Sequence, residues 1–477
     1  MKRSTFLSTA AACAALALLG CASPGSSSGG PAAAPSVQLP DHWAAPVPAD
    51  GAPAADLADW WQRFGDTELP TLVAEAQAAS PTLSAALARI EQARASRVAA
   101  GAALLPTVSA VGSVSQGRAA PKQPITGNAS LGAQAAWEID LFGANAAGRD
   151  AAQARLDGAR AGWHDARTAV AAEVATSYVA LRGCEAQLVQ TRIDADSRAE
   201  TTRLTELSAK AGFTAPADAA LARASAAQAR TLVVSQRAAC DTLLKSLVEL
   251  TDVAEPTLRA RLAPGTARLP VPQALPVRAL PAQLLAQRPD LAAAARQVAA
   301  AAADRRQSQA RQLPQVALSG SLAAATLRTG GESINGAVWS LGPLSVSFPV
   351  FDGGARAAAT SAAAAAYDDA VASYRAQVRR ALREVEVSLV ALQSTTEREA
   401  DVRAAAQDFE ASLRATEQRQ KGGLASLFDL ETARRNAVVA QTTLIDLQRE
   451  RSAAWISLYR ALGGGFDEAA LGRSAAP

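Results

Sequence analysis

Residues 339–354 read WSLGPLSVSFPVFDGG, and this stretch decides the fold. Leu344, Val346, Phe348 and Val350 alternate with other residues that are mostly polar, a period of two that indicates a β-strand with one apolar face. The stretch stops on two glycines, and no proline follows until the last residue of the chain. The sequence therefore predicts one strand that leads directly into one very long helix.

The same transition occurs earlier in the chain, where AAWEIDLFG at 135–143 precedes another long helical stretch. Pro289 repeats Pro81 at an offset of 208 residues (289 − 81), and Leu313-Pro314 repeats Leu105-Pro106 at the same offset (314 − 106). A fixed offset between similar segments is the signature of a repeated architecture. The chain is therefore expected to be an internal two-fold repeat.

The N-terminus resembles that of a bacterial lipoprotein. Lys2 and Arg3 precede an apolar segment that ends in Leu-Leu-Gly at 18–20, followed by Cys21. This segment is too short to span a bilayer as a mature helix. We expect cleavage before Cys21 and lipidation of this cysteine; an ordinary secretory peptide with an incidental cysteine is the alternative. Ala22, in place of an aspartate, is compatible with sorting to the outer membrane.

These features divide the 477 residues into six segments. They are a lipoprotein signal peptide (1–20), a lipid anchor with a Ser/Gly/Pro tether (21–55), a first repeat (56–253), a proline-rich crossover linker (254–283), a second repeat (284–465) and a C-terminal tail (466–477). Within the repeats, strands are expected at about 107–115, 130–142, 315–326 and 338–351, and long helical hairpins at 145–252 and 355–462.

Composition argues against several classes of function. The net charge is +3 and no basic cluster with interleaved aromatic residues occurs, so nucleic-acid binding is not expected. The chain has two histidines, His42 and His164, and shows no metal-spaced Cys/His cluster, phosphate-binding loop or nucleophile motif. We therefore expect no enzyme activity, no bound metal and no cofactor.

Two further cysteines lie at matched heights on a predicted helical hairpin. Heptad seams run through 170–188 and 233–250, and Gly212 separates the two helices. Cys184 lies 28 residues before Gly212 (212 − 184) and Cys240 lies 28 residues after it (240 − 212). Since geometry is the main obstacle to a disulfide, we expect one here, in an oxidising compartment; two buried free thiols are the alternative.

Strand counting predicts the oligomeric state. Each repeat carries two strands, which gives four per chain. Four strands cannot close a barrel, and lipid tolerates no open sheet edge, so one chain is not sufficient. Eight strands leave little lumen, whereas three chains supply twelve strands and a wet channel. A helix from Gly143 to Gly212 would be about 100 Å long. The expected fold is an α+β membrane protein, in which a trimeric 12-stranded transmembrane β-barrel continues into a long α-helical coiled-coil tunnel.

Five motifs are similar to those of the outer membrane efflux protein family, in the TolC-like superfamily, and specifically to NodT-type lipoproteins of RND efflux systems. The motifs are WWxxFGDxxL at 60–69, AWEIDLFG at 136–143, LLAQRPDL at 284–291, LGPLSVSFPVFDGG at 341–354 and LYRALGGG at 458–465. The resemblance implies a homotrimeric channel in the outer membrane with a periplasmic helical domain, acting as a passive exit duct for drugs or other small solutes. It also implies two partners, a periplasmic adaptor (membrane fusion) protein and an inner-membrane RND-type pump.

Two alternatives to this function stay open. One is the duct of a type I protein secretion system, and the other is a lipid-anchored coiled-coil scaffold or adhesin without a pore, against which the alternating strands argue. The chain also departs from the family pattern at two positions. Ala295 replaces a glutamate that often follows the RPD segment, and Ala425 replaces a basic residue that helps to tether the closed tip in some members.

Three carboxylates are candidates for a periplasmic gate. Asp218 and Asp429 each lie six residues after a glycine break (212 + 6 and 423 + 6), and Glu431 is close to the second. Repeated around a trimer axis, such carboxylates would form rings that favour cations and can gate a pore. The alternative is a solvated carboxylate stabilised near a helix N-terminus. The resemblance favours the gate, most of all for Asp429.

The polar face of the second strand supplies candidates for the barrel lumen, namely Gln134, Glu138 and Asp140. For Glu138 and Asp140, the alternative is a polar strand face exposed to water, which differs little from a position in the lumen. The aromatic residues Trp137, Trp339 and Phe351 fit an interfacial aromatic girdle and ordinary packing equally well. The Arg-Pro-Asp sequence at 288–290 is interpreted as the start of a helix rather than as a ligand site.

Overall fold

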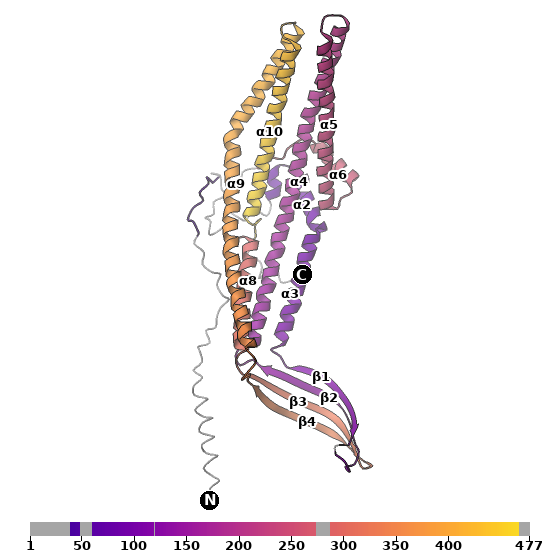
Figure 1. The fold of residues 1–477 in the computed structure, drawn as a ribbon, viewed down its shortest axis with the longest axis vertical. Coiled ribbons are helices and arrows are strands. Elements are labelled where there is room, and N and C mark those ends of the chain that lie inside the picture. Colours follow the sequence, from indigo (N-terminus) through magenta and orange to yellow (C-terminus); the bar gives the residue numbers. More distant parts are fainter. Residues whose placement is uncertain (1–38, 48–59, 119, 273–286, 467–477) are drawn as a thin grey trace.

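The computed structural model describes residues 39–47, 60–118, 120–272 and 287–466. Figure 1 shows an elongated molecule with a four-stranded sheet at one end, from which two long helical hairpins extend to the other end. Shorter helices pack beside the hairpins at mid-length and between there and the sheet. Among the described residues, no helix combines the length and the apolar character that a membrane-spanning helix needs.

The helices account for most of the molecule. They are η2 (Trp60–Phe64), α2 (Glu68–Ala79), α3 (Pro81–Ala102), α4 (Ala144–Lys210), α5 (Pro216–Thr251), α6 (Glu255–Leu262), η3 (Ala263–Gly265), α8 (Pro289–Ala310), α9 (Ala355–Lys421) and α10 (Leu427–Ala461). Both α4 and α9 contain 67 residues, which corresponds to a length of about 100 Å at 1.5 Å per residue. Each pairs with the helix that follows it, α5 or α10, across a turn that contains a glycine of positive φ.

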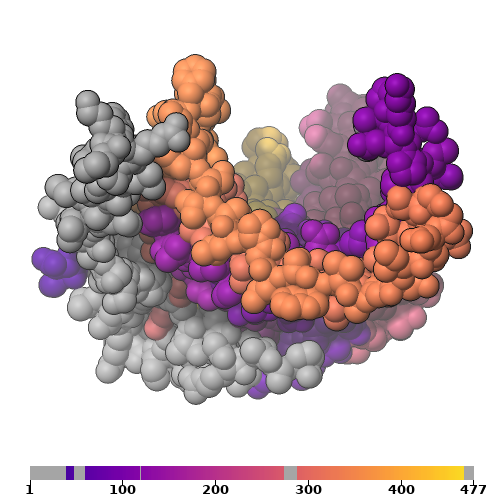
Figure 2. All heavy atoms as spheres, turned by 90° about the horizontal axis from the view of Figure 1, so that it is seen from below, coloured from indigo at the N-terminus to yellow at the C-terminus, as the bar shows by residue number. Residues whose placement is uncertain are grey.

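The strands form one antiparallel sheet in the order β1-β2-β3-β4. They are β1 (Thr107–Gly117), β2 (Thr126–Ile139), β3 (Gln315–Thr329) and β4 (Glu332–Ser347). Because β2 pairs with β3, the sheet joins the two halves of the chain, and β1 and β4 are its edges. Seen from the sheet end, the molecule is an open arc around a hollow (Figure 2).

The strands differ from those expected at the last residues of β1 and β3, by two and three residues, and at both ends of β2 and β4. β2 covers 126–139 rather than 130–142, and β4 covers 332–347 rather than 338–351. The turn between β3 and β4 is only Gly330-Gly331, with φ of 61° and 98°, so most of the residues between the two expected strands are themselves strand. Two consecutive residues of positive φ suit a tight hairpin turn. At the other end Pro349, which has no N–H to donate, lies beyond β4.

Each long helix begins at a left-handed glycine and is capped by an aspartate. Gly143 has φ 74° and Gly354 has φ 88°. Asp140 accepts hydrogen bonds from the backbone N–H groups of residues 145 and 146 at 3.1 and 2.7 Å. Asp352 accepts from those of residues 354 and 356 at 2.9 and 3.1 Å. N–H groups in the first turn of a helix have no partner within the helix, so the two carboxylates stabilise the corners between sheet and hairpin.

The largest core lies at mid-length, where the hairpins meet the shorter helices. Trp60 is fully buried and stacks on Tyr459 of α10, with ring centroids 5.0 Å apart and an angle of 12° between the planes. Trp61 packs against both of these rings, and Phe64 packs against Trp60. This cluster includes buried residues from α2, α4, α5, α6, α9 and α10. The core therefore joins elements from both halves of the chain.

The Arg-Pro-Asp sequence lies at the start of α8, which begins at Pro289. The side chain of Arg288 is buried and donates to both carboxylate oxygens of Asp290 at 3.0 and 2.8 Å. It also donates to Glu384 of α9 and to the backbone oxygen of Ala461 in α10, each at 2.8 Å. A buried guanidinium requires such partners, so this arginine fixes α8 against the second hairpin.

A short N-terminal segment crosses α9. The backbone N–H groups of Ala44 and Ala45 donate to the two carboxylate oxygens of Glu386 at 2.7 and 2.9 Å. Ala45 is buried, and Trp43 packs against the central core. Leu39 packs against a smaller cluster formed by α8 and α9. We call residues 39–45 the strap.

The structure contains a disulfide between Cys184 of α4 and Cys240 of α5. The two Cα atoms are 5.5 Å apart, and both residues lie in the central core. The two helices of the first hairpin are therefore tied together partway along their length. The second hairpin has no cysteines, and ion pairs such as that between Arg398 of α9 and Glu450 of α10, at 2.8 Å, join its helices in addition to packing.

Replacing both cysteines should destabilise the protein. The bond closes a loop with a sequence separation of 56 residues, and a disulfide over such a loop contributes about 2–4 kcal/mol. We expect the Cys184→Ala/Cys240→Ala variant to unfold at lower denaturant concentration than the parent. Peptide mapping without reductant should recover the linked peptides only from the parent. A parent whose unfolding is insensitive to reductant would contradict the prediction, and the double variant is the control for unspecific effects of the reductant.

The pairing of β2 with β3 should be sensitive to one methyl group. A Cβ at Gly132 would lie 2.2 Å from the carbonyl oxygen of Leu322 and 2.5 Å from the Cα of Ala323, and these backbone atoms cannot yield without loss of pairing. We expect Gly132→Ala to destabilise the sheet by about 1–3 kcal/mol. Gly127→Ala, in the same strand, is the matched control, because its nearest neighbour would be 3.8 Å away. Equal melting temperatures of the two variants, followed by the β-sheet signal in circular dichroism, would contradict this.

Candidate functional site

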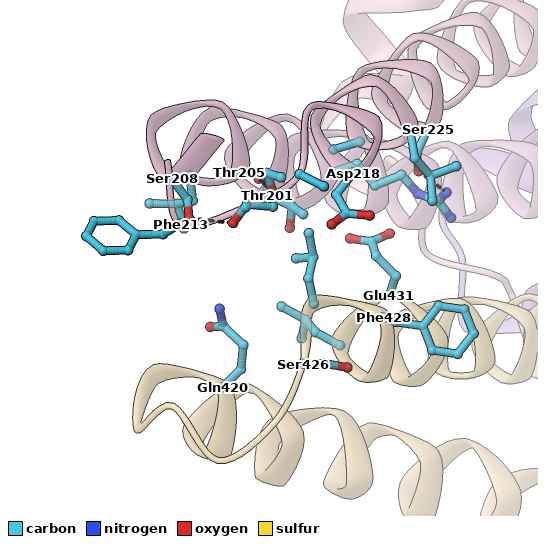
Figure 3. A pocket seen from close by; sticks show the side chains of 18 of the residues that line it. Thr201, Thr205, Ser208, Phe213, Asp218, Ser225, Gln420, Ser426, Phe428 and Glu431 are labelled. Atoms are coloured by element: carbon cyan, nitrogen blue, oxygen red, sulfur yellow. Dashed lines mark hydrogen bonds between the residues drawn. The ribbon is translucent and has the colours of Figure 1, made fainter. Parts of the chain in front are cut away.

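A cleft lies between the far ends of the two hairpins (Figure 3). Its volume is about 780 Å³, and it is lined by residues of α4, α5 and α10, by the two turns and by Gln420 of α9. The turn residue Phe213 and Phe428 of α10 are 86% and 74% exposed, and Leu221 is 67% exposed. Exposed apolar side chains of this size at the end of a charged, alanine-rich helical bundle indicate a surface that contacts other molecules.

Two of the three gate candidates face each other across this cleft. Asp218 lies in the first turn of α5 and Glu431 lies in α10, and their carboxylates point toward one another (Figure 3). Asp218 is exposed, and the positive end of the α5 dipole favours its negative charge. Glu431 accepts a hydrogen bond of 2.6 Å from Arg434, one turn further along α10. The cleft therefore contains one solvated carboxylate and one paired carboxylate.

Asp429, the favoured gate candidate, has a different local role. Its carboxylate accepts hydrogen bonds from the backbone N–H and the hydroxyl of Ser426, and its own N–H donates to that hydroxyl. This is a capping box at the start of α10. The hydrogen bonds from Ser426 hold the pKa of the Asp429 carboxyl below its ordinary value. The structure thus places Asp218 and Glu431 in the cleft and directs Asp429 to its own helix start.

The sheet separates its side chains into two faces. Gln134 pairs in register with Ser109 of β1 and Ser321 of β3, and Ser321 pairs with Ser340 of β4, so a polar row crosses all four strands. The Ser321 and Ser340 hydroxyls are 2.8 Å apart. Glu138 lies on the same face as Gln134, four residues along β2. Since paired residues share a face, these side chains line one side of the sheet.

The opposite face is apolar and exposed in the single chain. The large side chains on this face come from all four strands; they are Val108, Val114, Leu131, Trp137, Leu322, Trp339, Leu341, Leu344 and Val346. A register shift between Leu318 and Gly320 lets Leu341 and Leu344 lie on the same face although they are three residues apart. Alternation of this kind across a whole sheet suits lipid on one side and water on the other.

The remaining predicted site residues that the structure describes lie outside the cleft and the polar row. Asp140 follows the end of β2 and caps α4, as described above, so it is a corner residue rather than a member of the polar row. The indole N–H of Trp137 donates to the backbone oxygen of Leu104 at 3.1 Å, while Trp339 and Phe351 are 73% and 91% exposed. Cys21 lies outside the described residues. Among the residues that the structure describes, no group of three or more His, Cys, Asp or Glu side chains could hold a metal ion.

Several residues at the tip escaped the sequence analysis. Phe213 directly follows Gly212 and Phe428 lies five residues after Gly423 (428 − 423), and an aromatic residue beside a glycine break in a long helix was the available signal. The polar row was visible only in part, because serines at alternate positions are common in strands of many kinds. Which residues become neighbours in the row depends on strand register, and register is not contained in the alternation of a single strand.

Comparison with known proteins places the chain in a family. The family model for outer membrane efflux proteins matches residues 72–252 and 280–464. The chain is 29% identical to the pyoverdine export outer membrane protein OpmQ of Pseudomonas aeruginosa, covering 87% of this chain and 88% of OpmQ. It is 29% identical to the outer membrane protein OprJ of the same species, covering 91% and 92% of the two chains.

Solved structures agree with this assignment. The outer-membrane channel OprN superposes with a TM-score of 0.79 at 27% identity, covering 90% of this chain and 98% of OprN. The outer membrane protein VceC of Vibrio cholerae superposes with a TM-score of 0.75 at 25% identity, covering 86% and 99% of the two chains. The fold is thus that of the TolC-like outer membrane channels. The family match, the two-faced sheet and the projecting hairpins lead to one conclusion: the chain belongs to the outer membrane efflux protein family.

Proposed function

We propose that three copies of this chain form the outer membrane channel of a tripartite efflux system, a passive exit duct for drugs or other small solutes. One observation carries the proposal: a two-faced sheet with two free edges continues directly into two hairpins about 100 Å long. Lipid tolerates no free edge, so the sheet must close with other copies. Three copies supply twelve strands, with the polar row around Gln134 and Glu138 facing the lumen, and the hairpins form the wall of a periplasmic tunnel.

The same proposal assigns the partners. The exposed side chains at the hairpin ends, among them Phe213 and Phe428, suit docking of a periplasmic adaptor protein that is joined to an inner-membrane RND-type pump. The pump supplies the energy, and this chain supplies no catalytic step. A lipid on Cys21 anchors the N-terminus in the outer membrane. OpmQ is named for the export of pyoverdine, which supports a small solute as the cargo rather than a protein delivered by a type I secretion system.

Two measurements on the same gene test the proposed function. A deletion strain should become more susceptible to small toxic compounds, and the wild-type gene should restore resistance. The purified protein, inserted into planar bilayers, should conduct ions as a trimer. Loss of a secreted protein without any change in susceptibility would favour the type I alternative, and failure of the trimer to conduct would contradict a channel of either kind.

The carboxylates in the cleft should make the pore prefer cations. Three copies of Asp218 and Glu431 would place six carboxylates near the narrow end of the tunnel, and such rings attract cations. We expect Asp218→Asn/Glu431→Gln to reduce the cation-to-anion permeability ratio, measured as the reversal potential in a salt gradient. Asp429→Asn should change this ratio less, because its carboxylate is occupied in the capping box.

Asp408→Asn is the matched control for these variants, since it removes one exposed carboxylate from α9 at a position outside the cleft. A double variant with the same reversal potential as the Asp408→Asn protein would contradict a role of the cleft in ion selectivity. A larger effect of Asp429→Asn than of the double variant would restore Asp429 as the principal gate residue.

A further inference from the structure

A buried arginine links the two hairpins beside the cleft. Arg434 of α10 is only 5% exposed. Its Nη1 atom donates to the hydroxyl of Thr201 in α4 at 3.1 Å and to Glu431 at 2.6 Å. Thr201 is also 5% exposed and lines the floor of the cleft. The hydrogen bond between Arg434 and Thr201 therefore joins the second hairpin to the first inside their contact surface.

The hydrogen bond between Arg434 and Thr201 lies close to the hairpin ends. Thr201 lies nine residues before the end of α4 (210 − 201), which is about 14 Å along the helix axis. Another hydrogen bond between the hairpins, from Gln187 to Asp446 at 2.9 Å, lies 14 residues closer to the core (201 − 187), about 21 Å further from the ends. Beyond Thr201 the hairpins separate around the cleft (Figure 3). The arginine thus lies where the two hairpins cease to be in contact.

The chemistry of the link favours precise placement over stability. A buried guanidinium must be compensated by partners, and an apolar side chain of similar size is often equally stable or more so. The surroundings here are rich in alanine, so simple packing of an apolar residue would hold the helices together. What the guanidinium adds is direction, because its planar N–H groups donate hydrogen bonds only to acceptors in fixed positions. Glu431 keeps the pair in electrostatic balance and reaches the water of the cleft.

We propose that Arg434 is a positioning residue that sets the separation of the two hairpin ends and hence the width of the cleft. Through Thr201 it holds α10 against α4, and through Glu431 it fixes one of the two carboxylates that face the cleft. The inference rests on the proposed function only in one respect: the width of the cleft then controls passage through the tip. The placement itself is a property of the single chain.

A distance measurement tests the placement directly. Spin labels on Phe213→Cys and Leu424→Cys, at the exposed turns of the two hairpins, report the separation of the ends by pulsed electron paramagnetic resonance. The disulfide leaves Cys184 and Cys240 unreactive toward the label, and dilution with unlabelled protein suppresses distances between copies. We expect Arg434→Met and Thr201→Val each to broaden the distance distribution and to shift it to longer values, and Arg434→Lys, which keeps the charge, to restore part of the parent distribution.

Arg414→Met is the matched control, because Arg414 is an exposed arginine of α9 whose ion pair among the described residues, with Glu410 at 2.9 Å, lies within its own helix. The melting temperature of each variant identifies any general loss of folding. A parent-like distribution in Arg434→Met would overturn the inference, and so would the same broadening in Arg414→Met. Conductance in planar bilayers is the second measurement. An altered distance distribution in a protein that never conducts would leave the positioning role intact and contradict the proposed function instead.

Discussion

The free edges of the four-stranded sheet are the constraint on which the rest of the structure depends. β1 and β4 each present a row of unpaired backbone N–H and C=O groups, and the sheet has a continuous apolar face. Such a sheet is incomplete by itself in water and in lipid. In the proposed trimer, closure by further copies would pair these edges, with the polar row on the side of the lumen. Each long helix is attached to its strand by a short capped corner, so the sheet also fixes the direction of the helix.

Those corners show how two unlike sequences reach the same geometry. The aspartate lies four residues before the first residue of α4 but three residues before that of α9. In both places a glycine of positive φ turns the chain, and a carboxylate then accepts the first free N–H groups of the helix. Both corners therefore need a carboxylate that can reach the first N–H groups of the helix, and they do not need it at the same position in the sequence. A residue-by-residue comparison of the two halves would not align the two aspartates.

Much of the architecture was predictable because it follows from local periodicity. Alternation in residues 339–354 indicated a strand, the glycines at 212 and 423 indicated turns, and the equal distances of Cys184 and Cys240 from Gly212 indicated that the two cysteines meet. Local patterns could not show which partner a polar group chooses. Asp140 and Asp429 form hydrogen bonds at the N-termini of helices, and Arg434 is paired with a threonine 233 residues away. These pairings depend on how the hairpins pack, which no short window of the sequence contains.

The strap gives the molecule a mechanical property. Its two backbone hydrogen bonds to Glu386 and the packing of Trp43 attach the N-terminal segment to the middle of α9, beside the central core. A chain anchored to a membrane through Cys21 would therefore receive any pull from the anchor at the middle of α9. The end of α9 at Lys421 lies 35 residues beyond Glu386 (421 − 386), about 50 Å along the helix, so a pull from the anchor would act far from the hairpin ends.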